Sequence, residues 1–348
     1  MNKTWKVLFS NGAGEAQVWL RGSLSNGQCF NWTQLGQGEK GEEEIWQGVL
    51  GKQVVYLKQL AFEGSALHPV YYSSSMSEQA LHQYFRSEVD LETLYLEWSR
   101  NCARFLAIST KFRGIRVLRQ DKFECILSFI TSSNNNIKRI HSLLHKLRQE
   151  FGSKIEEAGD FYAFPSLEQL QGNVNFTQAK LREMGFGYRA KYLADTVRLL
   201  GADECKLWEM DSSSPMLTEE LCKLSGVGRK VADCIALFAF DRLEVVPVDV
   251  HVFRIAKRDY NAHGELDELV TMNKQTYAKV YHEFYSRFGS TCGWAHSVLF
   301  TCELAQFRDR VPKHMLAEMD LYKKQLARDK RSASSSSDEG EDKRFKQQ

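Results

Sequence analysis

The sequence predicts an α+β protein in which an N-terminal antiparallel β-sheet domain packs against a mainly helical domain. The first hundred residues contain short runs of β-branched and aromatic residues, whereas apolar residues follow a helical spacing from Phe123 onward. With 348 residues the chain is long enough for one to three domains. We expect a β-rich domain over residues 1–113, a helical domain over residues 114–325 and a disordered polar tail over residues 326–348.

Four segments near the N-terminus are predicted to be strands. Trp5–Phe9 and Ala16–Leu20 contain the β-branched and aromatic residues that strands favour. Ile45–Leu50 and Gln53–Leu57 flank Gly51-Lys52, and two such runs separated by a short turn with glycine are typical of a β-hairpin.

The second part of the chain is predicted to be helical. Its clearest segment is 137–151, where apolar residues recur at i, i+3, i+4 and i+7 and end before Gly152, a common residue at a helix C-terminus. Similar patterns predict six further helices at Ala179–Met184, Tyr192–Leu200, Thr218–Leu224, Val231–Phe240, Thr276–Phe288 and Trp294–Leu304.

Composition excludes several classes of protein. The formal net charge of +2 does not by itself indicate a nucleic-acid partner, although a local basic patch would suffice to bind one. No apolar run is long enough for a membrane span or a secretory signal, so we expect no membrane partner. The eight cysteines stand singly, without a C-x-x-C pair, and are expected to be reduced thiols that hold no metal or iron–sulfur cluster.

The C-terminal tail has a composition of its own. Serine and acidic residues dominate 332–342, and basic residues lie on both sides, at Lys330-Arg331 and at 343–346. Basic ends of this kind can direct a chain to the nucleus, although a solvated tail without an address is an equally ordinary interpretation. We expect nuclear residence, with the mitochondrion as a second compartment.

The segment from 218 to 240 is predicted to form two helices joined by a turn that contains Gly226-Val227-Gly228. The glycines permit positive φ and a close approach of the backbone, and the amides at the start of the second helix can bind a phosphate. Arg229 adds a cation at the same place. Such a helix–hairpin–helix grips DNA by its backbone, although a plain corner between two helices would show the same pattern.

Lys230 and Asp249 are the candidate catalytic pair. Lys230 lies at the electropositive start of the second helix, which is expected to lower its pKa and release a neutral amine. A neutral amine can attack the sugar C1′, expel a base and leave a Schiff base that permits strand cleavage by β-elimination. Asp249 ends the apolar Val246-Pro247-Val248 run in a catalytic loop over residues 246–251, where a carboxylate can stabilise charge at C1′.

These motifs resemble the eukaryotic 8-oxoguanine DNA glycosylase/AP lyase branch of the helix–hairpin–helix (HhH-GPD) superfamily. The resemblance runs from Gly27 to Phe300, and Ser225 stands where this branch usually has proline. It implies a bifunctional enzyme that excises 8-oxoguanine, and ring-opened formamidopyrimidine guanine, opposite cytosine in double-stranded DNA. It further implies a monomer that uses no cofactor.

The resemblance also assigns the residues that hold the lesion. The backbone carbonyl of Gly27 would accept the N7–H that distinguishes oxidised guanine from guanine, and Phe300 and Cys234 would sandwich the base. Phe238 would line the same pocket. His296 stands where the family has glutamine, so we expect weaker or pH-dependent discrimination of the lesion. Without the resemblance, Gly27 would be interpreted as an ordinary turn residue and both phenylalanines as core.

A second group of residues is expected to contact the duplex. By resemblance, Asn134 fills the space left by the flipped base, Arg139 and Arg189 bind the orphaned cytosine, and Tyr188 acts as a wedge. Guanidinium donors suit the acceptors of cytosine. His251 would contact a phosphate, although a single histidine often has only a structural role.

Two alternatives belong to other functional classes. A non-catalytic helix–hairpin–helix module would use the turn only to bind DNA, and Lys230 would then be dispensable. A glycosylase for other purine lesions would share the catalytic pair, but Gly27 and the two cytosine-binding arginines favour oxidised guanine over alkylated bases.

Overall fold

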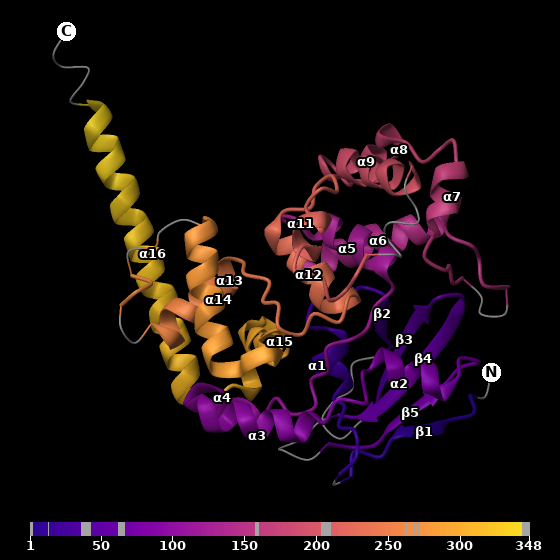
Figure 1. Cartoon of the computed structure of the whole chain (residues 1–348), viewed down its shortest axis with the longest axis horizontal. Coiled ribbons are helices and arrows are strands. Elements are labelled where there is room, and N and C mark those ends of the chain that lie inside the picture. The colour runs from indigo at the N-terminus through magenta and orange to yellow at the C-terminus, as the bar shows by residue number, and fades with distance from the viewer. Residues whose placement is uncertain are drawn as a thin grey trace.

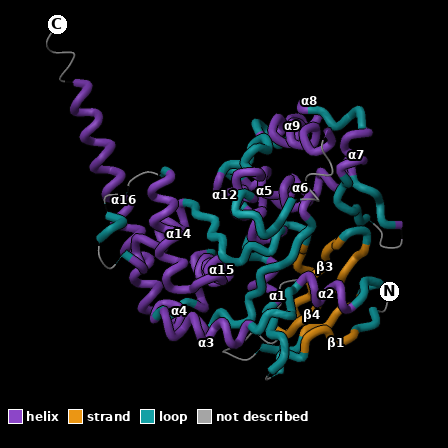
Figure 2. Tube along the Cα trace, in the orientation of Figure 1, coloured by secondary structure: helices purple, strands orange, loops and turns teal. Residues whose placement is uncertain are grey.

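A five-stranded sheet lies beside a larger assembly of helices, which confirms the predicted α+β class (Figure 1). In Figure 2 the strands gather on one side of the molecule and helices make up most of the rest. The computed structural model describes residues 3–12, 14–35, 43–61, 67–156, 160–202, 210–261, 264–267, 269 and 272–342. No helix among these residues is long and apolar enough to cross a membrane.

The sheet is antiparallel throughout, with the strand order β1-β5-β4-β3-β2. The predicted hairpin is confirmed, because Leu50 pairs with Gln53 across a two-residue turn in which Gly51 has a φ of 58°. The strands are β1 Lys6–Phe9, β2 Trp32–Leu35, β3 Glu43–Leu50, β4 Gln53–Leu60 and β5 Val70–Ser73.

The predicted strand at Ala16–Leu20 is wrong. This segment is extended without a strand partner and then turns into helix α1, Leu20–Leu24. The amides of Val18 and Leu20 donate to the side chains of Asn11 and Gln59, at 2.8 Å each, instead of to a neighbouring strand. Side chains therefore accept the backbone hydrogen bonds of this segment, although its residue types alone would predict pairing with a neighbouring strand.

The seven helices predicted after residue 136 are present, with ends that differ by a few residues. Gly152 follows α6 with a φ of −83°, and a Cβ there would lie 2.0 Å from the carbonyl oxygen of Ala163, so close packing requires this glycine. The helices are α2 Glu78–Tyr84, α3 Leu91–Asn101, α4 Ala103–Ser109, α5 Lys122–Ser132, α6 Ile137–Phe151, α7 Leu167–Gly172, α8 Gln178–Glu183, α9 Arg189–Ala202, α11 Leu217–Leu221, α12 Arg229–Ala239, α13 Val250–Ile255, η2 Ala256–Tyr260, α14 Lys274–Phe288, η3 Gly289–Thr291, α15 Cys292–Glu303, η4 Ala305–Arg310 and α16 Lys313–Asp342.

The buried apolar residues form two cores. The smaller core lies between the sheet and helices α1 and α2. The larger core fills the helical part and includes Tyr95, Trp98 and Phe105 of α3 and α4. These two helices were not predicted, because they lie within the first 113 residues, which were expected to be β-rich.

Helix α16 extends into the segment for which composition predicts disorder. Its base is packed through Met315 and Met319 and by ion pairs such as Arg104–Glu318. From there the helix projects away from the rest of the molecule (Figure 1). Residues 343–348 of the predicted tail lie outside the described residues. In the part of α16 beyond its packed base, the backbone groups form hydrogen bonds within the helix. A helix can therefore form there without apolar side chains.

The backbone of helix α15 is in direct contact with the backbone of the loop before α13. Gly293 donates its amide to the carbonyl of Leu243 at 2.8 Å. A Cβ at Gly293 would lie 2.2 Å from the carbonyl oxygen of Val245 and 2.8 Å from that of Leu243. Only glycine permits this contact, which fixes α15 against the loop that leads to α13.

Replacing Gly293 by alanine should destabilise the fold. We expect the free energy of unfolding in urea to fall by about 2 kcal/mol or more, because backbone atoms must move to admit the methyl group. Gly172→Ala is the matched control, since nothing lies within 4 Å of a Cβ at that helical position; its stability should stay the same or rise slightly. Equal denaturation midpoints for the two variants would contradict the close contact.

Candidate active site

One pocket, of about 460 Å³, brings together the predicted catalytic and lesion-binding residues. All seven of them line it, together with six residues that sequence reasoning did not identify. The predicted residues are Gly27, Lys230, Cys234, Phe238, Asp249, His296 and Phe300. The additional residues are Asn26, Gln28, Phe129, Pro247, Val252 and Ser297.

Gly27 is held in the pocket wall by its neighbours. It has a φ of 88°, which favours glycine, and a Cβ would lie 3.0 Å from Cδ1 of Ile137, so that the isoleucine side chain would have to shift. The side chain of Gln28 bonds to Ser23 and Arg116 carbonyls, at 2.7 and 2.8 Å. Gln120 donates its side-chain amide to the carbonyl of Gln28 at 2.7 Å. This polar network fixes the turn that carries Gly27.

The hairpin between α11 and α12 uses its two glycines differently. Gly226 has a φ of 78°, and a Cβ would lie 2.6 Å from the side chain of Tyr192. Gly228 is the N-cap of α12 with a φ of −92°, and nothing lies within 4 Å of a Cβ there. Of the two glycines, only Gly226 therefore uses the positive φ that glycine permits. The open surroundings of Gly228 instead leave the first amides of α12 accessible to an anion.

Lys230, the second residue of α12, is partly buried and lies beside Cys234 and Asp249. Burial would lower the pKa of its ammonium group, but the hydrogen bond with the Cys234 side chain and the charge of the Asp249 carboxylate act in the opposite direction, and the pKa is raised. The predicted fall in the pKa of Lys230 is therefore wrong, because the neighbours of the amine outweigh its burial. The amine must give up its proton before it can act as a nucleophile.

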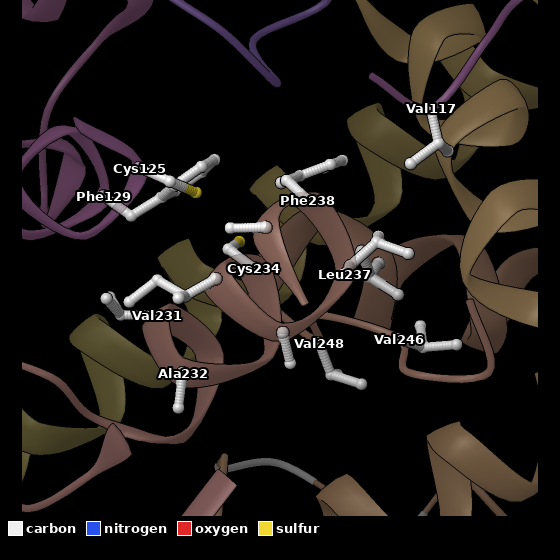
Figure 3. Packing of buried hydrophobic residues seen from close by; sticks show 14 of the residues in the cluster. Val117, Cys125, Phe129, Val231, Ala232, Cys234, Leu237, Phe238, Val246 and Val248 are labelled. Atoms are coloured by element: carbon white, nitrogen blue, oxygen red, sulfur yellow. The ribbon is translucent and has the colours of Figure 1, made fainter. Parts of the chain in front are cut away.

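Cys234 lies one turn after Lys230 and contacts it. Its side chain forms a hydrogen bond with Lys230, and burial raises the pKa of the thiol to about 11. The sulfur is therefore a neutral thiol at neutral pH. Figure 3 shows Cys234 and Phe238 on one face of α12, together with Phe129 from α5. The Phe129 and Phe238 rings stack with centroids 5.5 Å apart. Sequence reasoning missed Phe129 because a phenylalanine inside an apolar helix resembles any core residue.

Asp249 is fixed by the helix that follows it. As the N-cap of α13, its carboxylate accepts hydrogen bonds from the amides of His251 at 2.8 Å and Val252 at 3.0 Å. A carboxylate at a helix N-terminus is electrostatically favoured. Asp249 is the only carboxylate among the described residues that line the pocket.

His296 is buried in the pocket wall between two aromatic rings. The ring centroids of Phe284 and Phe300 lie 6.0 and 6.1 Å from that of His296. The buried Nδ1 of His296 has no hydrogen-bond partner among the described residues. Burial lowers the pKa of His296 to about 4. The imidazole is therefore neutral over the physiological range, and the predicted pH-dependent discrimination is wrong.

Two of the predicted DNA-contacting residues, Tyr188 and Arg189, meet at the carbonyl of Ser133, and neither lines the pocket. Tyr188, which is 48% exposed, donates its hydroxyl to the carbonyl of Ser133 at 3.0 Å. Arg189, only 3% exposed, donates to the carbonyls of Ser133 and Asn134, each at 2.8 Å. Arg139 is exposed. Asn134 has a φ of 47°, so the three groups surround a strained, exposed turn.

The role predicted for Arg189, binding the orphaned cytosine, stays a prediction. Its guanidinium is engaged by backbone carbonyls, whereas the guanidinium of Arg139 reaches the surface and bonds to the carbonyl of Gly185 at 3.2 Å. His251 is exposed beside the pocket, with its ring edge-on to Phe300 at 6.1 Å.

Known proteins similar to this chain share both its sequence and its fold. It is 34% identical to N-glycosylase/DNA lyase OGG1 of Arabidopsis thaliana, over 81% of this chain and 76% of that protein. It is 34% identical to the N-glycosylase/DNA lyase of Saccharomyces cerevisiae, over 83% and 84% of the two chains. The Clostridium acetobutylicum 8-oxoguanine glycosylase/lyase, solved with double-stranded DNA containing cytosine opposite 8-oxoguanine, superposes with a TM-score of 0.69. It is 30% identical, over 82% of this chain and 91% of that chain.

Residues 127–279 match the HhH-GPD superfamily of base excision DNA repair proteins. This range contains the hairpin, Lys230, Asp249 and most of the residues that line the pocket, whereas the other lining residues come from either side of it. Fold and site thus define a DNA glycosylase of the helix–hairpin–helix class. Residues 13–126 match the N-terminal domain of 8-oxoguanine DNA glycosylase. The chain belongs to the 8-oxoguanine DNA glycosylase family, and it is a DNA N-glycosylase that also has DNA lyase activity.

The pH dependence of base excision should not include a contribution from His296 near neutrality. Because its pKa is lowered to about 4, the ring gains a proton only as the pH falls toward 4. We expect single-turnover excision by the wild type and by His296→Gln to follow pH curves of the same shape between pH 6 and 8. A wild-type curve with an inflection near pH 6.5 that the variant lacks would show a titrating histidine instead.

Proposed function

We propose that this chain excises 8-oxoguanine, and ring-opened formamidopyrimidine guanine, where they pair with cytosine in double-stranded DNA. We further propose that it acts as a monomer. The observation that carries the proposal is the single pocket in which Lys230 and Asp249 meet the residues expected to hold the purine. The Clostridium acetobutylicum relative, solved with 8-oxoguanine opposite cytosine, supports this substrate.

The two catalytic residues have complementary tasks. Once Lys230 has lost its proton, its amine attacks C1′ as the bond to the base breaks, and the lost base carries away the electron pair of that bond. Asp249 is oriented by two backbone amides and can stabilise the positive charge that develops at C1′. The sugar ring then opens: the C1′–O4′ bond breaks, its electron pair stays on O4′, and O4′ takes up a proton. The resulting Schiff base between Lys230 and C1′ permits loss of a proton from C2′ and β-elimination of the 3′ phosphate.

Recognition of the lesion is divided between the two parts of the chain. Gly27, from the N-terminal part, offers a carbonyl to the N7–H of the oxidised base. Phe300 and Cys234 supply the flat walls on which a purine would pack. His296, neutral and in the pocket wall, can accept or donate one hydrogen bond at the edge of the base.

The opposite strand would be read at the surface around Ser133. Arg139 is exposed and has donors suited to cytosine. Asn134 is exposed at the turn that would enter the gap left by the flipped base. Arg189 would first have to exchange its carbonyl partners for the base.

The non-catalytic alternative, a module that only binds DNA, fits the position of Lys230 poorly. A lysine that binds phosphates is expected to be exposed, as is Lys223 on the same hairpin, whose side chain is 69% exposed. Lys230 instead lines the pocket, beside a buried thiol and a fixed carboxylate.

Borohydride trapping tests the proposed chemistry. We expect a covalent adduct with duplexes that contain 8-oxoguanine or formamidopyrimidine opposite cytosine, and a much weaker adduct when adenine is opposite. Lys230→Gln should abolish the adduct, because no Schiff base can form. Lys223→Gln removes the same charge from the same hairpin and should trap normally. A trapped adduct in Lys230→Gln, or equal trapping on undamaged DNA, would refute the proposal.

We also propose that the chain resides in the nucleus, with a smaller share in the mitochondrion. The basic residues at 330–331 and 343–346 support this assignment. A fluorescent fusion should concentrate in the nucleus, and replacing these basic residues by glutamine should spread it through the cell. An unchanged distribution would show that these residues are not the address.

A further inference from the structure

A polar cluster lies behind the active site, on the side of α12 that faces away from the pocket. At its centre is the carboxylate of Asp233, which is fully buried. It accepts hydrogen bonds from Nε of Arg229 at 3.0 Å and from the hydroxyl of Thr218 at 3.3 Å. The hydroxyl of Tyr277 is its third partner. Asp233 thus joins both helices of the hairpin to α14.

Tyr277 extends this cluster to the catalytic loop. Its hydroxyl accepts a hydrogen bond from the amide of Val248 at 3.1 Å and lies 2.9 Å from the carbonyl oxygen of Val246. These two groups flank Pro247, which has no amide hydrogen of its own. Asp249 follows directly on Val248. In Figure 3, Val246 and Val248 lie on the opposite side of α12 from Phe238.

The protonation of the two side chains suits this arrangement. Burial raises the pKa of the Tyr277 hydroxyl, as does the neighbouring Asp233 carboxylate, so the hydroxyl keeps its proton and remains a donor. Burial raises the pKa of the Asp233 carboxyl, whereas the hydrogen bond from Tyr277 and the guanidinium of Arg229 favour its charged form. The same guanidinium lies over the Tyr277 ring, 5.1 Å from its centroid.

We propose that Tyr277 and Asp233 are positioning residues that link the DNA-gripping hairpin to the catalytic Asp249. Neither lines the active-site pocket, so neither is expected to touch the substrate. Arg229 lies at the start of α12, where a phosphate is expected to bind. A chain of hydrogen bonds therefore runs from Arg229 through Asp233 and Tyr277 to the loop that carries Asp249. This inference rests on the proposed function, because it concerns the rate of the proposed excision step.

The sequence around Asp249 explains why such a link is needed. The carboxylate itself is fixed only to the amides of α13. The position of α13 relative to Lys230 depends on the loop before it, over residues 246–248. A displacement of about 1 Å in a catalytic group can lower the rate of a reaction about 100-fold. Loss of the Tyr277 hydroxyl frees the loop without removing any group from the pocket.

Tyr277→Phe is the variant that tests the link, and Tyr281→Phe is its matched control. Tyr281 lies one turn later on α14 and lines the same neighbouring cavity, of about 1570 Å³, as Tyr277. Its ring stacks on Tyr285. Both changes remove one hydroxyl from one helix, but only Tyr277 bonds to the catalytic loop.

The measurements are single-turnover excision, the Kd for the lesion duplex, and the melting temperature, each on the full chain. For Tyr277→Phe we expect excision to slow about 10- to 100-fold, with the Kd within two-fold of wild type and the melting temperature nearly unchanged. Tyr281→Phe should match the wild type in all three. Asp233→Asn, which keeps the shape but loses the charge, should slow excision in the same direction. Its effect should not add to that of Tyr277→Phe in the double variant, because both act through one chain.

Three results would overturn the inference. The first is a Tyr277→Phe excision rate within two-fold of wild type. The second is a loss of rate equal to that of Tyr281→Phe. The third is a loss of rate accompanied by a large fall in melting temperature, which would indicate a purely structural role. Failure of the wild type itself to excise the lesion or form an adduct would instead refute the proposed function, so the two failures are distinguishable.

Discussion

Helix α12 is buried on every side from Val231 to Ala239, and the active site depends on how its neighbours pack around it. Its pocket face carries Lys230, Cys234 and Phe238, one turn apart from each other. Its other side carries Asp233, which holds the hairpin and α14. A helix that can neither rotate nor slide therefore sets the direction of the nucleophile. The same packing explains why several residues at the site serve both the core and the chemistry.

The electrostatics of the pocket follow from this burial. Desolvation keeps the Cys234 thiol and the His296 ring neutral, and it leaves Lys230 and Asp249 as the charged pair among the described lining residues. The charge of Lys230 is stabilised by its neighbours. The structure therefore places the activation of the amine in a proton transfer and not in a permanently lowered pKa.

The motif residues could be predicted from sequence because their chemistry requires particular types at particular spacings. The hairpin and the loop after it indicate Lys230 and Asp249. Gly226 stands in the turn of the hairpin, where its φ is positive and glycine is favoured. Asp233 and Tyr277 could not be predicted in the same way. They lie 44 residues apart and meet only through the packing of α14 on the hairpin. Phe129 was missed for a related reason, since its role depends on which face of α5 meets α12.

Errors in the predicted fold have a common physical origin. Ala16–Leu20 has the composition of a strand, but side chains of Asn11 and Gln59 take the hydrogen bonds that a neighbouring strand would supply. The guanidinium of Arg189 is likewise engaged by carbonyls far away in the sequence, those of Ser133 and Asn134. In both places a polar contact that the local residue types do not indicate decides which groups are paired.

The contact at Gly293 has a mechanical consequence for the pocket. With no space between α15 and the loop before α13, the wall formed by His296, Phe300 and Asp249 behaves as one rigid block. The opposite wall, at Gly27, belongs to the N-terminal part of the chain. Any widening of the pocket must therefore be a movement of one wall against the other. Such a movement would stretch the joint at Gln120, whose backbone amide bonds to Phe238 and whose side chain bonds to Gln28.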